Sequence, residues 1–470
     1  MRSRARLFAL LALLVFAAAP ARAAGPTFVV DSTADQHDLN PGDGLCQAAF
    51  DVCTLRAAIE EANTTTDALI QVPEMTIPLG IGDLLVSSSM KIEGAGMKKT
   101  VVAAASGFRI FTLSVDSIGL ALANLTLKDG SLTGGAGGAV ALTYPASLDM
   151  DHVLVTNCSA PYAGGVYTTG DFTISNSVFE ACHATKAGGV GGQAGAIYIG
   201  PSGSGSALGI IETSTFHQNT SIAAGGAIDL LGGYGILDLA NCTVSGNHAG
   251  GGGGGIRVEG GTLNLDHVTV TDNVSDIFAG GGGLSNGAAA SAATFINSII
   301  ASNYDVNNNF LVDGDCAGAV TSQASCNILG PSGTPHCTVS GTYSAATPSF
   351  GPLQDNGGAT PTHALLAGSA GVDGPGCILF HPILTDQRGV HRVGVADLGA
   401  YERAPCGDVN GDGTVDVSDV FFLINALFAG GAVPPGLANV NGDSSLDVSD
   451  VFYLINRLFA GGSAPTCPGT

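Results

Sequence analysis

Tryptophan and basic residues are scarce in this chain of 470 residues. It has no Trp, and its 16 Lys and Arg stand against 39 Asp and Glu, which gives a formal net charge of −23. Such a surface repels nucleic acid and anionic membranes and favours cations such as calcium. After the first 23 residues, no apolar run reaches the roughly 18 residues that suggest a membrane-spanning helix. We therefore expect neither a nucleic-acid partner nor membrane insertion.

The first 23 residues have the features of a secretory signal peptide. Arginines open the segment, an apolar run extends from Leu7 to Ala19, and Ala21-Arg22-Ala23 fits a small-residue cleavage site. The alternative is a buried N-terminal helix. We expect a secreted, extracellular protein, and in that oxidising environment its 11 cysteines can form disulfides with at least one thiol left over.

Glycine, by contrast, is abundant at 70 residues, and an internal repeat occupies residues 101–303. Seven segments align on a common pattern of polar and apolar places. Their third positions are Asn124, His152, Asn176, Thr213, Asn241, His267 and Asn297. The residues six places further on are Gly130, Cys158, Cys182, Asn219, Asn247, Asn273 and Asn303. Between the segments a Gly-Gly-apolar unit recurs, as in Gly254-Gly255-Ile256.

The spacing of the apolar residues predicts short strands joined by corners. They stand at −2, +1 and +3 about the third position, whereas an uninterrupted strand would alternate by two throughout. The extra residue indicates a corner at the Asn, which tolerates left-handed dihedrals, and the second Asn indicates another corner. Each repeat then forms one coil of a parallel β-helix, right-handed like most parallel connections, with an asparagine ladder between coils. A β-propeller is the alternative, but its repeats are longer.

We expect both ends of this solenoid to be capped, because open ends expose strand edges and apolar interior. In the N-terminal region, residues 26–100, apolar residues at helical spacing predict a capping helix around Leu55 and Ile59. Residues 304–403 lose the repeat and are expected to form a C-terminal cap or a few irregular last coils. The fold class is thus mainly β, with a small α-helical calcium-binding module at residues 404–470.

That module contains two copies of an EF-hand-type calcium loop, each followed by an apolar helical stripe. Oxygen ligands are expected at positions 1, 3, 5, 7, 9 and 12 of each loop, the seventh through its backbone carbonyl. The ligands predicted in the first loop are Asp408, Asn410, Asp412, Thr414, Asp416 and Asp419. Those in the second are Asn439, Asn441, Asp443, Ser445, Asp447 and Asp450. The alternative is a duplicated turn without metal.

The two loops differ in charge and in turn chemistry. The first has Asp408 at position 1 and Gly413 at the sharp turn, whereas the second has Asn439 and Ser444 there. Because affinity for calcium depends on ligand charge and on a suitable turn, we predict two calcium sites, the second weaker.

No incoming helix precedes either loop, and over about 65 residues the module resembles a type I dockerin. The resemblance implies calcium-dependent folding and a cohesin domain on a scaffold or surface protein as partner. It implies the contact residues Val417, Ser418 and Asn425, with Val448, Ser449 and Asn456 as a duplicated face. Basic residues often follow the first helical turn in dockerins, but Ile424 and Asn425 stand there in this chain.

Two other segments resemble parts of secreted bacterial proteins. Residues 27–63, centred on Cys53-Thr54-Leu55-Arg56, are similar to the CSLREA domain. Residues 345–402, with Thr385-Asp-Gln-Arg-Gly389 and Asp397-Leu-Gly-Ala-Tyr-Glu402, resemble the choice-of-anchor region that closes such β-helices. The resemblance implies an extracellular protein attached to a surface or scaffold.

The cysteines suggest three disulfides. Cys46 and Cys53 bracket a short loop, and Cys406 and Cys467 flank the C-terminal module. Cys158 and Cys182 occupy the same place in consecutive repeats, so stacking at about 4.8 Å would permit a third bond, with two stacked thiols as the alternative. Cys242 is expected to be a lone buried thiol. The pairing of the remaining four stays open: Cys316, Cys326, Cys337 and Cys377.

The repeats do not show a catalytic signature, and we assign no catalytic residue. Lyase chemistry needs a basic residue in a carboxylate cluster, but Lys128, Lys186 and Arg257 lie in different repeats. His152 and His267 occupy the asparagine corner, which favours a structural role. We therefore expect a cohesin-docked protein whose β-helix binds a polysaccharide or a surface partner. The alternatives are a dockerin-borne polysaccharide lyase or glycoside hydrolase, and a passive adhesin.

Overall fold

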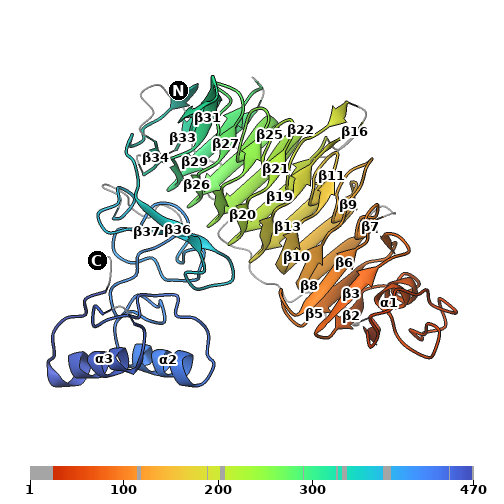
Figure 1. Ribbon diagram of the computed structural model, residues 1–470, viewed down its shortest axis with the longest axis horizontal. Helices are drawn as coiled ribbons and strands as arrows, with labels where there is room; N and C mark the ends of the chain where they lie inside the picture. The colour runs from red at the N-terminus through yellow and green to blue at the C-terminus, as the bar shows by residue number, and fades with distance from the viewer. Residues whose placement is uncertain are drawn as a thin grey trace, which may run out of the picture.

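A long solenoid of parallel strands dominates the structure, with a helix at one end and a helical module beside it (Figure 1). The computed structural model describes residues 25–113, 118–187, 189–201, 207–288, 291–323, 326–330, 336–373, 383–443 and 445–467. The expected signal peptide, Cys377 and Ser444 lie outside these residues. The mainly β fold with a parallel β-helix is confirmed.

In this part of the chain, successive coils build three long parallel ladders. Ladder 1 contains β1 (Thr27–Val29), β2 (Ala68–Val72), β5 (Met90–Gly94), β8 (Gly119–Lys128), β10 (Ser147–Thr156), β13 (Asp171–Ser175), β19 (Leu208–Glu212), β22 (Ile228–Ala240), β25 (Ile256–Asp266) and β29 (Ala292–Ile296). Ladder 2 contains β3 (Met75–Leu79), β6 (Thr100–Ala104), the ends of β8 and β10, β14 (Val178–Glu180), β20 (Thr215–His217), β23 (Thr243–Ser245), β26 (Thr269–Thr271), β30 (Ile299–Ile300) and β34 (Ile328–Leu329). Ladder 3 contains β4 (Leu84–Val86), β7 (Phe111–Leu113), β9 (Val140–Leu142), β12 (Val166–Thr168), β18 (Ile197–Ile199), the starts of β22 and β25, β28 (Leu284–Asn286) and β33 (Cys316–Ser322).

Shorter strands complete the coils. A fourth ladder contains β11 (Ser159–Ala160), β15 (His183–Ala184), β21 (Thr220–Ser221), β24 (His248–Ala249), β27 (Val274–Ser275), β31 (Tyr304–Asn307) and the antiparallel β32 (Phe310–Asp313). The other strands are β16 (Lys186–Ala187), β17 (Val190–Gly191), β35 (His336–Ser340), β36 (Phe350–Gln354) and β37 (Thr362–Leu365). The last two form an antiparallel hairpin beside the solenoid (Figure 1).

The predicted corners are present in every aligned repeat. All seven third positions, from Asn124 to Asn297, have φ between 47° and 57°, so each turns the chain between ladders 1 and 2 in the left-handed region. His152 and His267 share this geometry, and each lies beside an aspartate, at 3.0 Å and 2.7 Å. Their predicted structural place at the corner is therefore confirmed.

The asparagine ladder is also present inside the solenoid. Asn219, Asn247 and Asn273 each donate through Nδ2 to the side-chain oxygen of the next coil at 2.9 Å, and the row continues through Asn303 to Asp315. The second corner, however, differs from the prediction. The left-handed residue stands one place earlier, for example Asp272, because the Asn must turn inward to pair with its neighbours.

The N-terminal cap is confirmed as a helix, α1 (Leu55–Ala62). Thr54 caps it by accepting a hydrogen bond from the Ala57 amide at 3.1 Å. Leu55 and Ile59 are fully buried in the same core as the first coils, so the helix covers the apolar end of the stack (Figure 1). The predicted Cys46–Cys53 disulfide fastens the loop before it.

The C-terminal region, expected as a cap or a few irregular last coils, has two parts. The described residues 304–323, 326–330 and 336–340 build irregular last coils, which the Cys316–Cys337 disulfide joins. Residues 345–373 and 383–402, which we call the flank segment, lie along the outer face of ladder 2. The aligned threonines Thr215, Thr243 and Thr269 of that ladder each form a hydrogen bond with this segment.

Two glutamine bonds show how the flank segment is attached. Gln387 donates to Thr215 Oγ1 and accepts from Thr243 Oγ1, each at 2.7 Å. Arg392 donates to Asn241 Oδ1 at 2.9 Å, and Leu398 and Tyr401 join an apolar cluster with Ile299 and Ile328. The flank segment therefore contacts several coils, including the one that contains Ile328.

The expected Cys158–Cys182 disulfide is wrong. The register that pairs Thr156 with Glu180 and Ser159 with His183 does stack the two cysteines, as predicted. Both are nevertheless buried free thiols, which lie near backbone carbonyl oxygens at 3.4 Å and 3.6 Å. Identical places in successive coils point both side chains the same way, and each thiol has its own carbonyl acceptor. Cys242 is a buried free thiol, as predicted, whereas Cys326 is disulfide-bonded.

Candidate functional site

The two loop–helix units of the C-terminal module have the same local design. Helix α2 (Val417–Phe428) follows the first loop, and α3 (Val448–Ala460) follows the second. In each unit an Asp caps the helix and a second Asp three residues later accepts from the amide of the first, which closes a capping box. The same four carboxylates were predicted as calcium ligands at positions 9 and 12, so loop and helix share them.

The first loop is wrapped around a buried carboxylate. Asp408 is fully buried and accepts hydrogen bonds from the amides of Gly411, Asp412 and Gly413, at 2.8–3.1 Å. Asp419 accepts from the amides of Val409 and Asn410, which ties the helix back to the start of the loop. Burial, together with the like charges of Asp419 and Asp412, raises the pKa of the Asp408 carboxyl to about 6.

The second loop lacks this central carboxylate. Asn439 donates through Nδ2 to the Asp443 carbonyl at 2.9 Å, while its buried Oδ1 has no hydrogen-bond partner among the residues that the structure describes. Asp450 is fully buried and accepts from the Val440 amide at 2.8 Å, as its counterpart does in the first loop.

These features fit a hard cation. Buried carboxylates that repel one another and an unpaired amide oxygen are groups that calcium would satisfy, since calcium takes oxygen ligands. Among the described residues, no group of three or more His, Cys, Asp or Glu side chains meets the geometry of a metal site. The loop pattern adds amide and backbone oxygens to the predicted ligands. When bound, calcium would neutralise the like charges of the loops.

The helices expose a duplicated apolar face. Val417, Phe421 and Phe428 of α2 are 44 %, 66 % and 64 % exposed. Their counterparts on α3, Val448, Phe452 and Phe459, are exposed to the same degree. Of the predicted contact residues, Ser418 is half-buried, and the others are exposed: Val417, Asn425, Val448, Ser449 and Asn456. The phenylalanines were missed, although their repetition outside the core stripe was visible in the sequence.

The first loop packs against the flank segment. The His391 amide donates to the Gly411 carbonyl at 2.7 Å. A Cβ at Gly411 would come within 2.9 Å of the buried Val390 side chain, so this glycine permits the close approach. The Cys406–Cys467 disulfide, as predicted, joins the two ends of the module.

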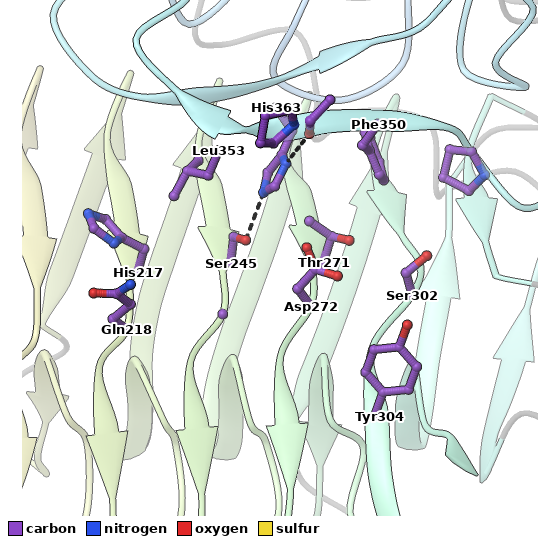
Figure 2. Close-up of a pocket in the computed structure, with 14 residues that line it drawn as sticks. His217, Gln218, Ser245, Thr271, Asp272, Ser302, Tyr304, Phe350, Leu353 and His363 are labelled. Carbon is purple, nitrogen blue, oxygen red and sulfur yellow. Dashed lines mark hydrogen bonds between the residues drawn. The ribbon is translucent and has the colours of Figure 1, made fainter. Parts of the chain in front are cut away.

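A second candidate site lies where the β36–β37 hairpin crosses the solenoid (Figure 2). This cleft has a volume of about 520 Å³, within the usual range for small-ligand sites. Its floor comes from ladder 2 and the following corner, and its roof includes Phe350, Leu353 and His363 (Figure 2). Sequence reasoning missed it, because floor and roof are far apart in the chain.

Ser245 and His363 join the floor to the roof. Ser245 Oγ lies 2.8 Å from His363 Nε2, and His363 Nδ1 lies 2.8 Å from the Gly351 carbonyl, so the ring donates to the carbonyl and accepts from the serine. Both residues are buried, at 3 % and 6 % exposure. The contact resembles a serine–histidine pair in distance alone; it is one of the polar bonds that fasten the flank segment, in line with those of Gln387.

The basic and acidic residues considered for catalysis are dispersed or paired. Arg257 is held by Asp229 at 2.7 Å and by Glu259 at 3.1 Å on ladder 3, away from the cleft. At the cleft, His217 lies 3.2 Å from Glu180, and hydrogen bonding to His217 lowers the pKa of that carboxyl. The described structure therefore does not bring the three candidate cations of the repeats into one site.

Comparisons with known proteins give a family match for the C-terminal module. Residues 406–459 match the dockerin type I domain family. No curated protein matches the chain. Among solved structures, a PL6 family alginate lyase matches with 11 % identity and a TM-score of 0.23, covering 63 % of this chain and 52 % of that one. The chain thus spans about half the length of that structure.

The chain therefore carries a dockerin type I domain, a class of module that binds calcium and implies a cohesin partner. None of the described helices is long and apolar enough to cross a membrane.

Proposed function

We propose that this protein is secreted and docks through its calcium-loaded dockerin domain onto a cohesin of a scaffold or surface protein, while its β-helix binds a polysaccharide. The observation that carries the first part is the duplicated apolar face on two closed loop–helix units. Exposed phenylalanine and valine side chains at matched places are costly in water, and a partner that covers them gains their burial.

The proposed calcium sites use the twelve ligands predicted from the loops, with the first site stronger. Buried Asp408 supports this order, because a carboxylate at position 1 attracts calcium more strongly than the Asn439 amide does. The disulfides support secretion, because such bonds persist in oxidising compartments.

The cohesin test uses the intact protein and a panel of immobilised type I cohesins. We expect binding in calcium and its loss in excess chelator. The double variant Val417→Asp with Val448→Asp should weaken binding at least 100-fold, because it places a charge on both copies of the face. The matched control is Val433→Asp, which adds the same charge to an exposed residue between the helices. Equal binding by the double variant and the control would refute this face.

Polysaccharide binding rests on the cleft, whose polar floor and apolar roof suit a sugar chain. The alternative remains a carbohydrate-active enzyme delivered by the dockerin. An assay for released reducing ends and unsaturated products, run on the same polysaccharides that bind, separates the two. Product formation above a boiled control would favour the enzyme.

A further inference from the structure

We propose that the cleft beneath the β36–β37 hairpin binds a neutral polysaccharide chain that runs along the solenoid axis across Gly246. This inference deepens the polysaccharide-binding function proposed above: it places the site and states the charge of the ligand. It concerns a part of the chain that the dockerin domain does not include.

The floor of the cleft is a row of corner residues from successive coils. The ladder register aligns Gln218, Gly246, Asp272 and Ser302, and all four have left-handed φ between 55° and 65°. Three carry hydrogen-bonding side chains, and the glycine leaves a gap between them. A Cβ at Gly246 would meet no atom within 4 Å, so the gap is open space and not the close packing found at the glycine turns.

The dimensions of this gap suit a ligand aligned with the axis. Adjacent strands are about 4.8 Å apart, so Gln218 and Asp272 stand roughly 10 Å apart on either side of Gly246. That span accommodates consecutive sugar units of an extended chain. The amide of Gln218 offers donors and an acceptor, and the Asp272 carboxylate accepts from sugar hydroxyls.

The roof supplies the apolar contact that a sugar ring also needs. Phe350 and Leu353 are half-buried and face the floor from the hairpin (Figure 2). Tyr304 lies at one end of the cleft and His217 at the other (Figure 2). A pyranose ring presents hydroxyls at its edge and C–H groups on its faces, which matches polar groups on the floor and an apolar roof.

The charges of the cleft select against an acidic ligand. The described residues that line the cleft include Asp272 but no Lys or Arg. Glu180 lies beside His217, which also lines the cleft. The whole chain has a formal net charge of −23. A uronate polymer would bring carboxylates against these groups without a compensating cation, so a neutral glycan is the better match.

The test measures binding of neutral hexamers to the intact protein by calorimetry. The probes are cellohexaose, xylohexaose and mannohexaose, with a mannuronate hexamer as the acidic comparison. The deciding variant is Gly246→Asn, which fills the gap. The backbone tolerates it, because Asn157 stands at the aligned corner of an earlier coil with a φ of 53°.

The matched control is Ala279→Asn, which adds the same side chain to an exposed left-handed residue after β27, outside the corner row and the cleft lining. We expect at least one neutral hexamer to bind, a loss of at least tenfold in Gly246→Asn, and unchanged affinity in Ala279→Asn. Thermal unfolding of both variants, monitored by circular dichroism, checks that the fold is retained.

Each result has a defined meaning. Binding of a neutral hexamer that Gly246→Asn leaves unchanged would overturn the cleft as the site while leaving the polysaccharide function standing. Binding of the mannuronate hexamer alone would overturn the proposed charge selection. Failure of all four hexamers would overturn both this inference and polysaccharide binding, but not cohesin docking, which is measured separately.

Discussion

The two predicted calcium loops of the dockerin domain share one sequence pattern but have different surroundings. The first contains the buried Asp408 carboxylate and packs against Val390 of the flank segment. The second has Asn439 at the same place, and Gly442 there lies near Thr466 of the C-terminal tail. The first loop therefore packs directly on the flank segment, whereas the contacts described for the second loop lie within the module.

This difference separates two roles that a duplicated module would otherwise share. The first unit fixes the module to the flank segment through the His391–Gly411 hydrogen bond. The second unit has no such attachment among its described contacts and is held by α2, α3 and the Cys406–Cys467 disulfide. The two units thus share the same loop chemistry. The first unit attaches the module to the flank segment, whereas the second has no such contact among those described.

The largest expected effect is that of calcium removal. Chelation should leave the like charges of both loops uncompensated and unfold the module, while the solenoid coils stay folded. Hydrogen exchange of the intact protein should show loss of protection in α2 and α3 and unchanged protection in ladder 1. If the first unit kept full protection without calcium, its packing on the flank segment would be sufficient to fold it.

Removal of the terminal disulfide is the next test. Cys406 and Cys467 are separated by 61 residues, and closing such a loop stabilises by about 4 kcal/mol in the chain-entropy model. In Cys406→Ser with Cys467→Ser, we expect amide hydrogen exchange to rise more in α3 than in α2. The reason is that α2 follows the loop that remains packed against the flank segment. The control is Cys46→Ser with Cys53→Ser, which should leave both helices unchanged.

The flank contact can be weakened directly. Val390 is fully buried, and Val390→Ala should cost about 1–2 kcal/mol through lost packing. The expected result is lower calcium affinity in the first loop and an unchanged second loop, measured by titration. A matched control is Val395→Ala, an exposed residue five places further along the segment. Equal effects on both loops would show that the module responds as one unit.

Swapping the residues at position 1 of the two loops should have the smallest effect. We expect Asp408→Asn to weaken the first site by about tenfold, or ~1.4 kcal/mol, and Asn439→Asp to strengthen the second by a similar factor. Calcium titration of the double exchange should then reverse the order of the two sites. If the first site stayed stronger, its packing and not its charge would set the order.

The repetitive part of the molecule could be predicted because its signals are local. A corner at Asn124 or Asn297 requires a residue that tolerates left-handed dihedrals, and the sequence shows one at each repeat. The buried asparagines from Asn219 to Asn303 follow from their constant place in successive coils. The two loop–helix units of the C-terminal module were predictable for the same reason.

The cleft and the flank segment were not predictable in this way. The Gln387–Thr215 bond joins residues 172 positions apart, and no short pattern specifies such a contact. The repeated threonines Thr215, Thr243 and Thr269 were a weak signal of the covering segment. The signal was ambiguous, because a row of outward hydroxyl groups can bond to water as well as to another part of the chain. The predicted Cys158–Cys182 disulfide was wrong for a different reason. Two cysteines can stack in successive coils without having the geometry that a disulfide needs.

The route of the flank segment has a mechanical consequence. A stack of coils that touch only their neighbours peels from a loaded end, one coil after another. In this protein, a force applied to the bound dockerin is transmitted through residues 383–403. These residues contact four successive coils in parallel, those of Thr215, Thr243, Thr269 and Ile299. Tension is then shared as shear over several coils instead of opening the last one. Pulling between the dockerin and an N-terminal handle should therefore give a higher rupture force in the intact protein than in Gln387→Ala.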